Sequence, residues 1–248
     1  MDPQNLILVA MAFALGGILK GATGAGAPLL AVPMLATLFD VQFAVAVFVL
    51  PNLVPNLWQA WHYRRVEISR VFVMKFALAG GLGAAIGTYA LAKTSSQTLI
   101  AGVAVILLVY ITFRLLKPVW QVPFSIADRV SIPLGTLAGI LQGATGLSAP
   151  VSITFLNAIN FDRPQFILAI STFFFTLGLV QLPLQVALGI MTWDRLGLSA
   201  LALIPLLCAM PIGMAIGRRL SRRAFDTLLL CLLGALALRM LSSVFLAI

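Results

Sequence analysis

The amino-acid sequence predicts an all-α, polytopic membrane protein made of two inverted repeats. Each repeat is expected to be a broken, re-entrant helical hairpin followed by three transmembrane helices. Composition, the lengths of the apolar stretches and an internal duplication support this prediction. Of the 248 residues, 61% are apolar and 9% are charged, with a mean hydropathy of +1.09. A soluble domain carries about 25% charged residues, so this chain has too few to cover a water-facing surface.

Eight apolar stretches define the expected elements. One membrane crossing needs about 20 residues. The stretches 5–39 and 130–161 are too long for one crossing, and glycine and proline interrupt both, so we expect each to form a hairpin of two arms. The six single crossings are expected at 41–62, 70–92, 97–116, 164–191, 196–217 and 224–248.

The two hairpin stretches are copies of each other. The segment "LGGILKGATGAGAP" at 15–28 aligns with "LAGILQGATGLSAP" at 137–150 at a constant offset of 122 residues. We therefore predict an N-terminal repeat over residues 1–122 and a C-terminal repeat over residues 123–248. Internal repeats of this kind are typical of transporters.

The distribution of basic residues favours re-entrant hairpins. If all eight stretches simply alternate across the membrane, eight basic residues lie on one side and six on the other. If stretch 130–161 returns to its own side as a hairpin, twelve lie on one side and two, Lys93 and Arg195, on the other. The positive-inside rule selects this hairpin. The hairpin at 5–39 rests on the duplication alone; with both hairpins the second repeat is inverted and both termini lie outside. The net charge of +9 then marks cytoplasmic loops, and we expect no nucleic-acid partner.

The hairpin tips are expected to bind an anion. A helix that begins within the membrane directs unpaired N–H groups and a partial positive charge at whatever lies before it. Two tips that enter from opposite faces would meet near the midplane and form a pocket rich in donors. The alternative is close helix packing, which we favour for the G-x-x-x-G pairs Gly83/Gly87 and Gly213/Gly217. The tip residues expected at the site are Gly21, Thr23, Gly24, Gly26, Gly143, Thr145, Gly146 and Ser148.

Lys20 is the strongest single candidate for a substrate-binding residue. It precedes the first tip and lies far from either end of its apolar stretch, where an ionisable group is costly and indicates function. The alternative is that its side chain reaches an interface. Its counterpart in the second repeat is Gln142, a neutral donor. Arg239 in the last apolar stretch is a further candidate, for which snorkelling is an equal alternative.

A polar stripe lies on the first crossing of the N-terminal repeat. Asn52, Asn56 and Gln59 share one helical face, and Gln181 and Gln185 repeat this pattern more weakly in the other half. Such a stripe either forms hydrogen bonds between helices or lines a polar pathway. We expect it to line the pathway and to contribute to substrate binding.

The acidic residues favour an anion over a cation as substrate. All seven carboxylates map to loops or segment ends, so none is expected inside the membrane to bind a cation or relay a proton. Asp40 and Asp162 precede helix starts and are expected to cap them, with Gln165 completing a capping box in the second case. We expect no metal site and no cofactor.

The duplicated glycine-rich hairpin resembles the TauE/SafE sulfite-exporter family, also called TSUP. The resemblance lies in the segments from Gly17 and Gly21 to Pro28 and from Gly139 and Gly143 to Pro150, and it extends over the whole chain in length and repeat number. It implies a carrier of small sulfur-containing or carboxylated anions, such as sulfite, thiosulfate and sulfoacetate, in the bacterial inner membrane.

Together, these observations predict a secondary transporter of small sulfur-containing anions that works by alternating access, with the anion and the lipid bilayer as its partners. The alternatives are an anion channel and a transporter of small carboxylates. An intramembrane serine hydrolase using Ser148 is disfavoured, because the single histidine, His62, is expected near the cytoplasmic interface.

Overall fold

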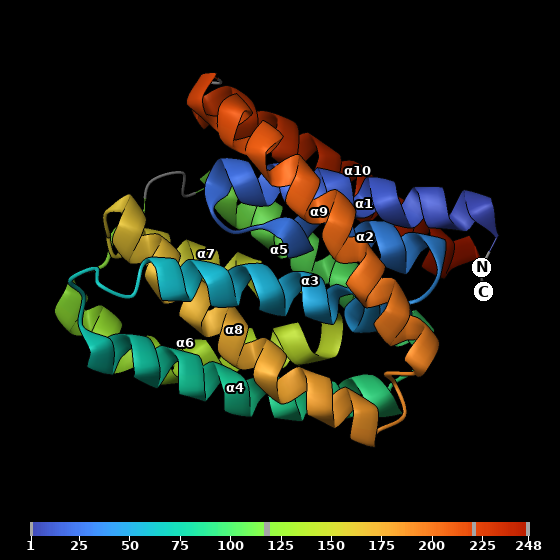
Figure 1. Ribbon diagram of the computed structural model, residues 1–248, viewed down its shortest axis with the longest axis horizontal. Coiled ribbons are helices and arrows are strands. Elements are labelled where there is room, and N and C mark those ends of the chain that lie inside the picture. Colours follow the sequence, from blue (N-terminus) through green and yellow to red (C-terminus); the bar gives the residue numbers. More distant parts are fainter. Residues whose placement is uncertain (1, 117–119, 220–221, 247–248) are drawn as a thin grey trace.

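The computed structural model describes residues 2–116, 120–219 and 222–246, and at 218–219, 222–229 and 243–246 it describes the backbone alone (Figure 1). The described residues form helices joined by short loops and contain no strand. The helices are α1 (Pro3–Thr23), α2 (Ala27–Leu38), α3 (Val41–His62), α4 (Arg70–Lys93), α5 (Ser96–Leu116), α6 (Phe124–Thr145), α7 (Ala149–Ala158), α8 (Arg163–Ala187), α9 (Trp193–Arg219) and α10 (Arg222–Leu246).

The lengths of these helices identify a multi-pass membrane protein. Within the described residues, seven helices are long and apolar enough to cross a membrane, namely α1, α3, α4, α5, α6, α8 and α9. The described apolar part of α10 runs from Leu230 to Ser242. By contrast, α2 has 12 residues and α7 has 10, fewer than the about 20 that a crossing needs. The predicted all-helical, polytopic fold class is confirmed.

A glycine in the left-handed conformation ends the first arm of each hairpin. Gly24 has φ 82° and Gly146 has φ 74°, backbone angles that glycine adopts without steric cost. The N–H of Gly24 donates to the Lys20 carbonyl at 2.7 Å, and that of Gly146 donates to the Gln142 carbonyl at 2.8 Å. The two breaks therefore have the same local geometry at positions related by the sequence duplication.

The first arm of the second hairpin begins earlier than the apolar pattern indicates. Helix α6 starts at Phe124, before the predicted stretch 130–161, and its first turns carry the charged residues Asp128 and Arg129. The hydropathy pattern leaves these turns out of the predicted hairpin because they carry charged residues. In the structure, the ammonium of Lys75 on α4 contacts the Asp128 carboxylate at 3.0 Å, and this ion pair holds the first turns of α6 against α4.

The helix caps predicted from the acidic residues are confirmed. The Asp40 carboxylate accepts a hydrogen bond from the Phe43 N–H at 2.7 Å at the start of α3. Asp162 accepts from the Gln165 N–H at 2.8 Å, and the Gln165 side chain in turn accepts from the Asp162 N–H at 3.2 Å, which completes a capping box. Both carboxylates are therefore used at helix ends rather than inside the bundle.

Glycine lets α1 and α9 pack at close range, although they come from different halves of the chain. A Cβ atom at Gly17 would overlap the backbone of Leu206, and one at Gly21 would overlap the backbone of Met210. A Cβ at Gly213 would in turn meet the backbone of Ile18. Because Gly17 contacts Leu206 and Gly21, one turn later, contacts Met210, the two helices run in the same direction.

Helices α4 and α6 pack in the same way. A Cβ at Gly83 would overlap the Thr136 carbonyl, and one at Gly87 would overlap the Ile140 carbonyl. From the α6 side, a Cβ at Gly143 would meet the backbone of Ala84. The packing interpretation of the G-x-x-x-G pairs is therefore confirmed, and Gly143, like Gly21, also lies in a helix-packing contact.

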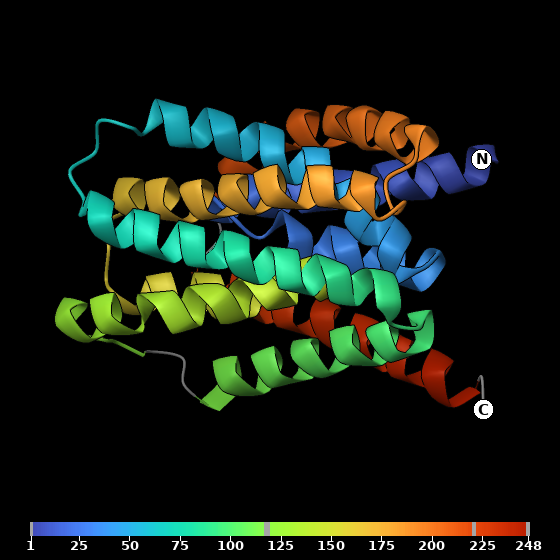
Figure 2. The same cartoon turned by 90° about the horizontal axis from the view of Figure 1, so that it is seen from below.

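Each hairpin thus packs along a helix of the other half. Because α6 runs parallel to α4, and α4 runs opposite to α1, the first arms of the two hairpins enter the bundle from opposite ends (Figures 1 and 2). Helix α1 begins and α10 ends at one end of the bundle, as both views show. Helices α3 and α8 pack against each other between the two halves.

We predict that Gly83→Leu destabilises the protein by about 1–3 kcal/mol or more, because the added side chain meets backbone that cannot rotate away. The expected result is a lower melting temperature of the purified protein. Gly102→Leu on α5 is the matched control, since no atom lies within 4 Å of a Cβ built there. Equal melting temperatures for the two variants would contradict the packing role of Gly83.

Candidate functional site

Lys20 is a buried cation with one hydrogen-bond acceptor. Its side chain on α1 is 3% exposed, and its ammonium donates to the Asn56 Oδ1 atom on α3 at 2.8 Å. An ammonium has three N–H donors, and among the described residues no carboxylate forms an ion pair with Lys20. A buried charge without a counter-charge is unfavourable. Lys20 is therefore buried with unused N–H donors and, among the described residues, without a counter-charge.

Asparagine side chains hold the acceptor of Lys20 in place. The Asn56 amide donates to the Asn52 backbone carbonyl at 2.6 Å and to the Asn52 Oδ1 atom at 3.1 Å. The Asn52 amide in turn donates to the Phe174 carbonyl on α8 at 3.1 Å. This sequence of hydrogen bonds runs from the first hairpin through α3 to the other half of the chain.

The third member of the α3 stripe also contacts α8. Gln59 is 6% exposed, and its Oε1 atom accepts a hydrogen bond from the Ser171 hydroxyl at 3.1 Å. The stripe thus forms hydrogen bonds between helices, which is the alternative considered above, and it also presents Asn56 to Lys20. The inter-helix interpretation is therefore confirmed, and the expectation that the stripe lines a pathway stays a prediction.

Gln142 occupies the position of Lys20 in the second hairpin, but its side-chain oxygen is hydrogen-bonded within its own tip. Its Oε1 atom accepts from the Ser148 N–H at 3.1 Å and from the Ser148 hydroxyl at 2.9 Å. The Gln181 amide on α8 approaches the Gln142 backbone carbonyl at 3.4 Å. The Ser152 hydroxyl donates to the Ser148 carbonyl at 3.0 Å. The second tip is therefore neutral and closed by its own hydrogen bonds.

The tip threonines donate their hydroxyl groups to their own helices. Thr23 donates to the Leu19 carbonyl at 2.8 Å and also contacts the Ala25 carbonyl, and Thr145 donates to the Leu141 carbonyl at 2.7 Å. Thr145 is buried, whereas Thr23 is exposed. These hydroxyls help to end α1 and α6, and their donor capacity is used in that role.

The tip glycines lie against helices of the opposite half. A Cβ at Gly24 would lie 3.1 Å from the Ile167 side chain on α8, and one at Gly146 would lie 2.9 Å from Val32 and 3.2 Å from Val45. Gly26 has φ 100° and begins α2. The contacts of the two tips therefore lead to α2, α3 and α8, rather than directly to each other as the sequence analysis expected.

Arg239 lies apart from these residues. Its side chain is exposed on α10, which packs against α5 and α2, and no hydrogen bond joins it to Lys20 or to the polar residues of α3 and α8. The structure does not bring Arg239 into the buried cluster, so we leave it out of the site.

Two further buried polar residues lie near the second tip. The side-chain amide of Gln185 on α8 is fully buried, and within the described residues neither its nitrogen nor its oxygen has a hydrogen-bond partner. The hydroxyl of Thr88 on α4, beside Gly143, is also buried without a hydrogen-bond partner among the described residues. Gln185 follows Gln181 by one helical turn, a spacing visible in the sequence, whereas no local pattern marks Thr88.

The fold and the site together define a class of protein. Broken helices within a multi-pass helical bundle, next to a buried and unpaired cation, are features of membrane carriers of small solutes. Residues 8–240 match the family described as sulfite exporter TauE/SafE, and the chain belongs to this family. Comparisons with curated proteins and with solved structures gave no match. Family membership indicates transport of sulfur-containing anions as the general function.

We predict that Asn56→Leu destabilises the protein, because it removes the acceptor of the buried Lys20 ammonium at 2.8 Å and leaves that donor unsatisfied. Such a loss costs about 1–3 kcal/mol, so the melting temperature should fall measurably. Asn157→Leu, at an exposed position on α7, is the control and should leave the melting temperature nearly unchanged. A melting temperature of Asn56→Leu equal to the native value would contradict the role of Asn56 as the acceptor of Lys20.

Proposed function

We propose that this protein is a secondary transporter that moves small sulfur-containing anions, of the sulfite, thiosulfate or sulfoacetate type, across the bacterial inner membrane. The observation that carries the proposal is the buried Lys20 ammonium with a single hydrogen-bond acceptor. An oxyanion has several acceptor oxygens and a negative charge, so it would satisfy both the unused N–H donors and the unpaired charge.

The placement of the acidic residues supports an anion as substrate. Every carboxylate whose side chain the structure describes is exposed or partly exposed, at a helix end or in a loop. None lies beside Lys20 to compete with a bound anion. A carrier of cations or protons usually has an acidic residue inside the membrane.

The packing between the two halves supports alternating access. We propose that residues 1–122 and 123–248 are inverted repeats, because equivalent hairpins enter from opposite ends and each packs along a helix of the other half. A shift of one half against the other would move both tips along α3 and α8. This is the motion that opens a central site first to one face and then to the other.

A channel or a transporter of small carboxylates would use the same cation. The continuous helix packing around Lys20, which leaves it 3% exposed, favours a carrier over an open pore. Catalysis by Ser148 lacks a base, because its hydroxyl donates to Gln142 and the His62 ring stacks on Trp58, with ring centroids 5.2 Å apart, at the end of α3. We therefore propose transport without a chemical reaction.

We expect Lys20→Gln to weaken anion binding by about 10- to 100-fold, the loss that corresponds to one hydrogen bond to a charged group. The measurement is saturable counterflow in proteoliposomes, with sulfite, thiosulfate, sulfate, sulfoacetate, taurine and small carboxylates as test solutes. Lys75→Gln, which removes a half-exposed partner of Asp128 at the end of the bundle, is the control and should retain the native affinity. Unchanged affinity in Lys20→Gln would remove Lys20 from the site, and flux that does not saturate would indicate a channel.

The inverted arrangement predicts which loops share a membrane face. In a chain whose Cys208 and Cys231 are replaced by serine, single cysteines at Lys93 and Trp193 should react with an impermeant thiol reagent from outside. Single cysteines at Arg65 and Arg163 should react from the cytoplasmic side, because the basic residues collect there. Labelling of Lys93→Cys and Arg163→Cys from the same side would contradict inverted repeats.

A further inference from the structure

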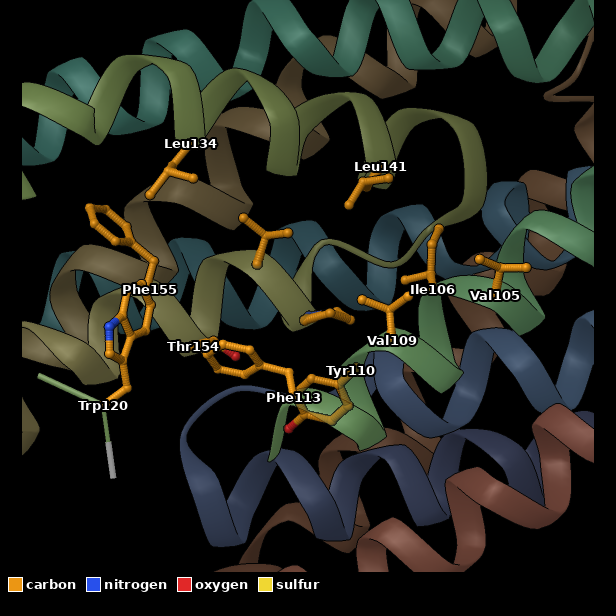
Figure 3. A pocket seen from close by; sticks show the side chains of 12 residues that line it. Val105, Ile106, Val109, Tyr110, Phe113, Trp120, Leu134, Leu141, Thr154 and Phe155 are labelled. Carbon is orange, nitrogen blue, oxygen red and sulfur yellow. The ribbon is translucent and has the colours of Figure 1, made fainter. Parts of the chain in front are cut away.

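An apolar cavity of about 300 Å³ lies between α5, α6 and α7, away from Lys20 (Figure 3). Side chains of Val109 and Tyr110 from α5, Leu141 from α6, and Thr154 and Phe155 from α7 point into it, as Figure 3 shows. Its volume is at the lower end of the range of about 300–1,000 Å³ that is typical of ligand sites. The cavity is therefore large enough for part of a flexible hydrocarbon chain.

The cavity opens toward the lipid phase. Val105 and Val109, which line it, are 53% and 63% exposed on α5, a helix that crosses the membrane. The surrounding medium at this depth is hydrocarbon, and the walls are almost entirely carbon. Among the lining residues only Thr154 and Tyr110 carry a hydroxyl group, and the Thr154 hydroxyl has no hydrogen-bond partner among the described residues. A hydrocarbon chain from the bilayer matches these walls.

One end of the cavity has the features of a membrane interface. Trp120, in the linker before α6, lines it there and packs edge-on against Phe113, with ring centroids 5.7 Å apart. Tryptophan is enriched at the level of the lipid headgroups. Figure 2 shows that α5 ends and α6 begins at the same end of the bundle; Arg114 lies in the last turn of α5 and Arg129 in the second turn of α6. Their positive charge complements a lipid phosphate.

The equivalent elements in the other half are in direct contact. Helix α10, the counterpart of α5, packs against α2, the counterpart of α7, and against α5. The α10 side chains of Leu233, Ala237 and Met240 are fully buried in an apolar cluster that also includes residues of α2 and α5. The described part of α10 thus buries its apolar side chains in the bundle, whereas Val105 and Val109 of α5 remain exposed beside the cavity.

We infer that this cavity binds one acyl chain of an anionic membrane phospholipid, and that the lipid braces α7. The apolar lining matches the chain, and the basic residues at the end of α5 and the start of α6 match the phosphate. The inference is independent of which anion the protein transports. Because α7 begins directly after Ser148, whose hydroxyl donates to Gln142, a lipid wedged between α5 and α7 supports the geometry of the second tip.

The experiment measures the lipid that stays bound. Purified protein is exchanged into detergent with phosphatidylglycerol or phosphatidylcholine, washed, and analysed by native mass spectrometry. The native chain should retain one phosphatidylglycerol. The double variant Val109→Phe/Val151→Phe, which fills the cavity, should retain at least about 10-fold less. Leu82→Phe and Leu238→Phe, at lipid-facing positions 70% and 65% exposed, are matched controls and should retain the lipid as the native chain does.

Two outcomes would overturn the inference: no lipid retained by the native chain, or equal retention by the filled variant. Equal retention of phosphatidylcholine would overturn the choice of an anionic headgroup. If the double variant unfolds, Trp120 provides a second measurement in a chain whose Trp58, Trp61 and Trp193 are replaced by phenylalanine. Phosphatidylglycerol with brominated chains should then quench Trp120 with saturation at one lipid per chain. Quenching that rises only in proportion to lipid content would indicate bulk contact and contradict the site.

Discussion

The hydrogen bond from Lys20 to Asn56 is the interaction on which the candidate site depends. Inside a bilayer, water does not solvate an ammonium group, so the protein must supply its partners or leave them to a ligand. The structure supplies one acceptor, and it fixes that acceptor through Asn52 and the α8 backbone. The charge is therefore held in place but remains unneutralised. This combination favours a mobile anion over a permanent ion pair, which would occupy the site.

The glycine contacts between the halves determine where this charge lies. Close approach of α1 to α9 and of α6 to α4 requires positions without a side chain, and Gly21 and Gly143 stand at such positions next to Lys20 and Gln142. The break after each arm requires a positive φ angle, which Gly24 and Gly146 provide. Small residues thus have two separate functions in these hairpins: close packing along the arm and chain reversal at the tip.

The two hairpins share a backbone but differ in chemistry. At the first, Lys20 is charged and reaches across to α3. At the second, Gln142 is neutral and bonds to Ser148 of its own tip. An apolar cavity lies beside α7 of the second hairpin. The two hairpins therefore share the geometry of the chain reversal, while Lys20 places a charge at the first tip and the apolar cavity lies beside the second hairpin.

The sequence by itself determined the membrane class, the helix breaks and the position of Lys20 far from the ends of an apolar stretch, because hydropathy, glycine spacing and an intramembrane charge are local properties. It also determined the caps at Asp40 and Asp162. Only the tertiary structure decided which helices pack together, that Arg239 lies outside the cluster, and that Gln185 is buried without a partner. It also set the start of α6, through a contact with Lys75 far away in the chain. These features depend on contacts between residues that are distant in the sequence, and local sequence patterns do not predict such contacts.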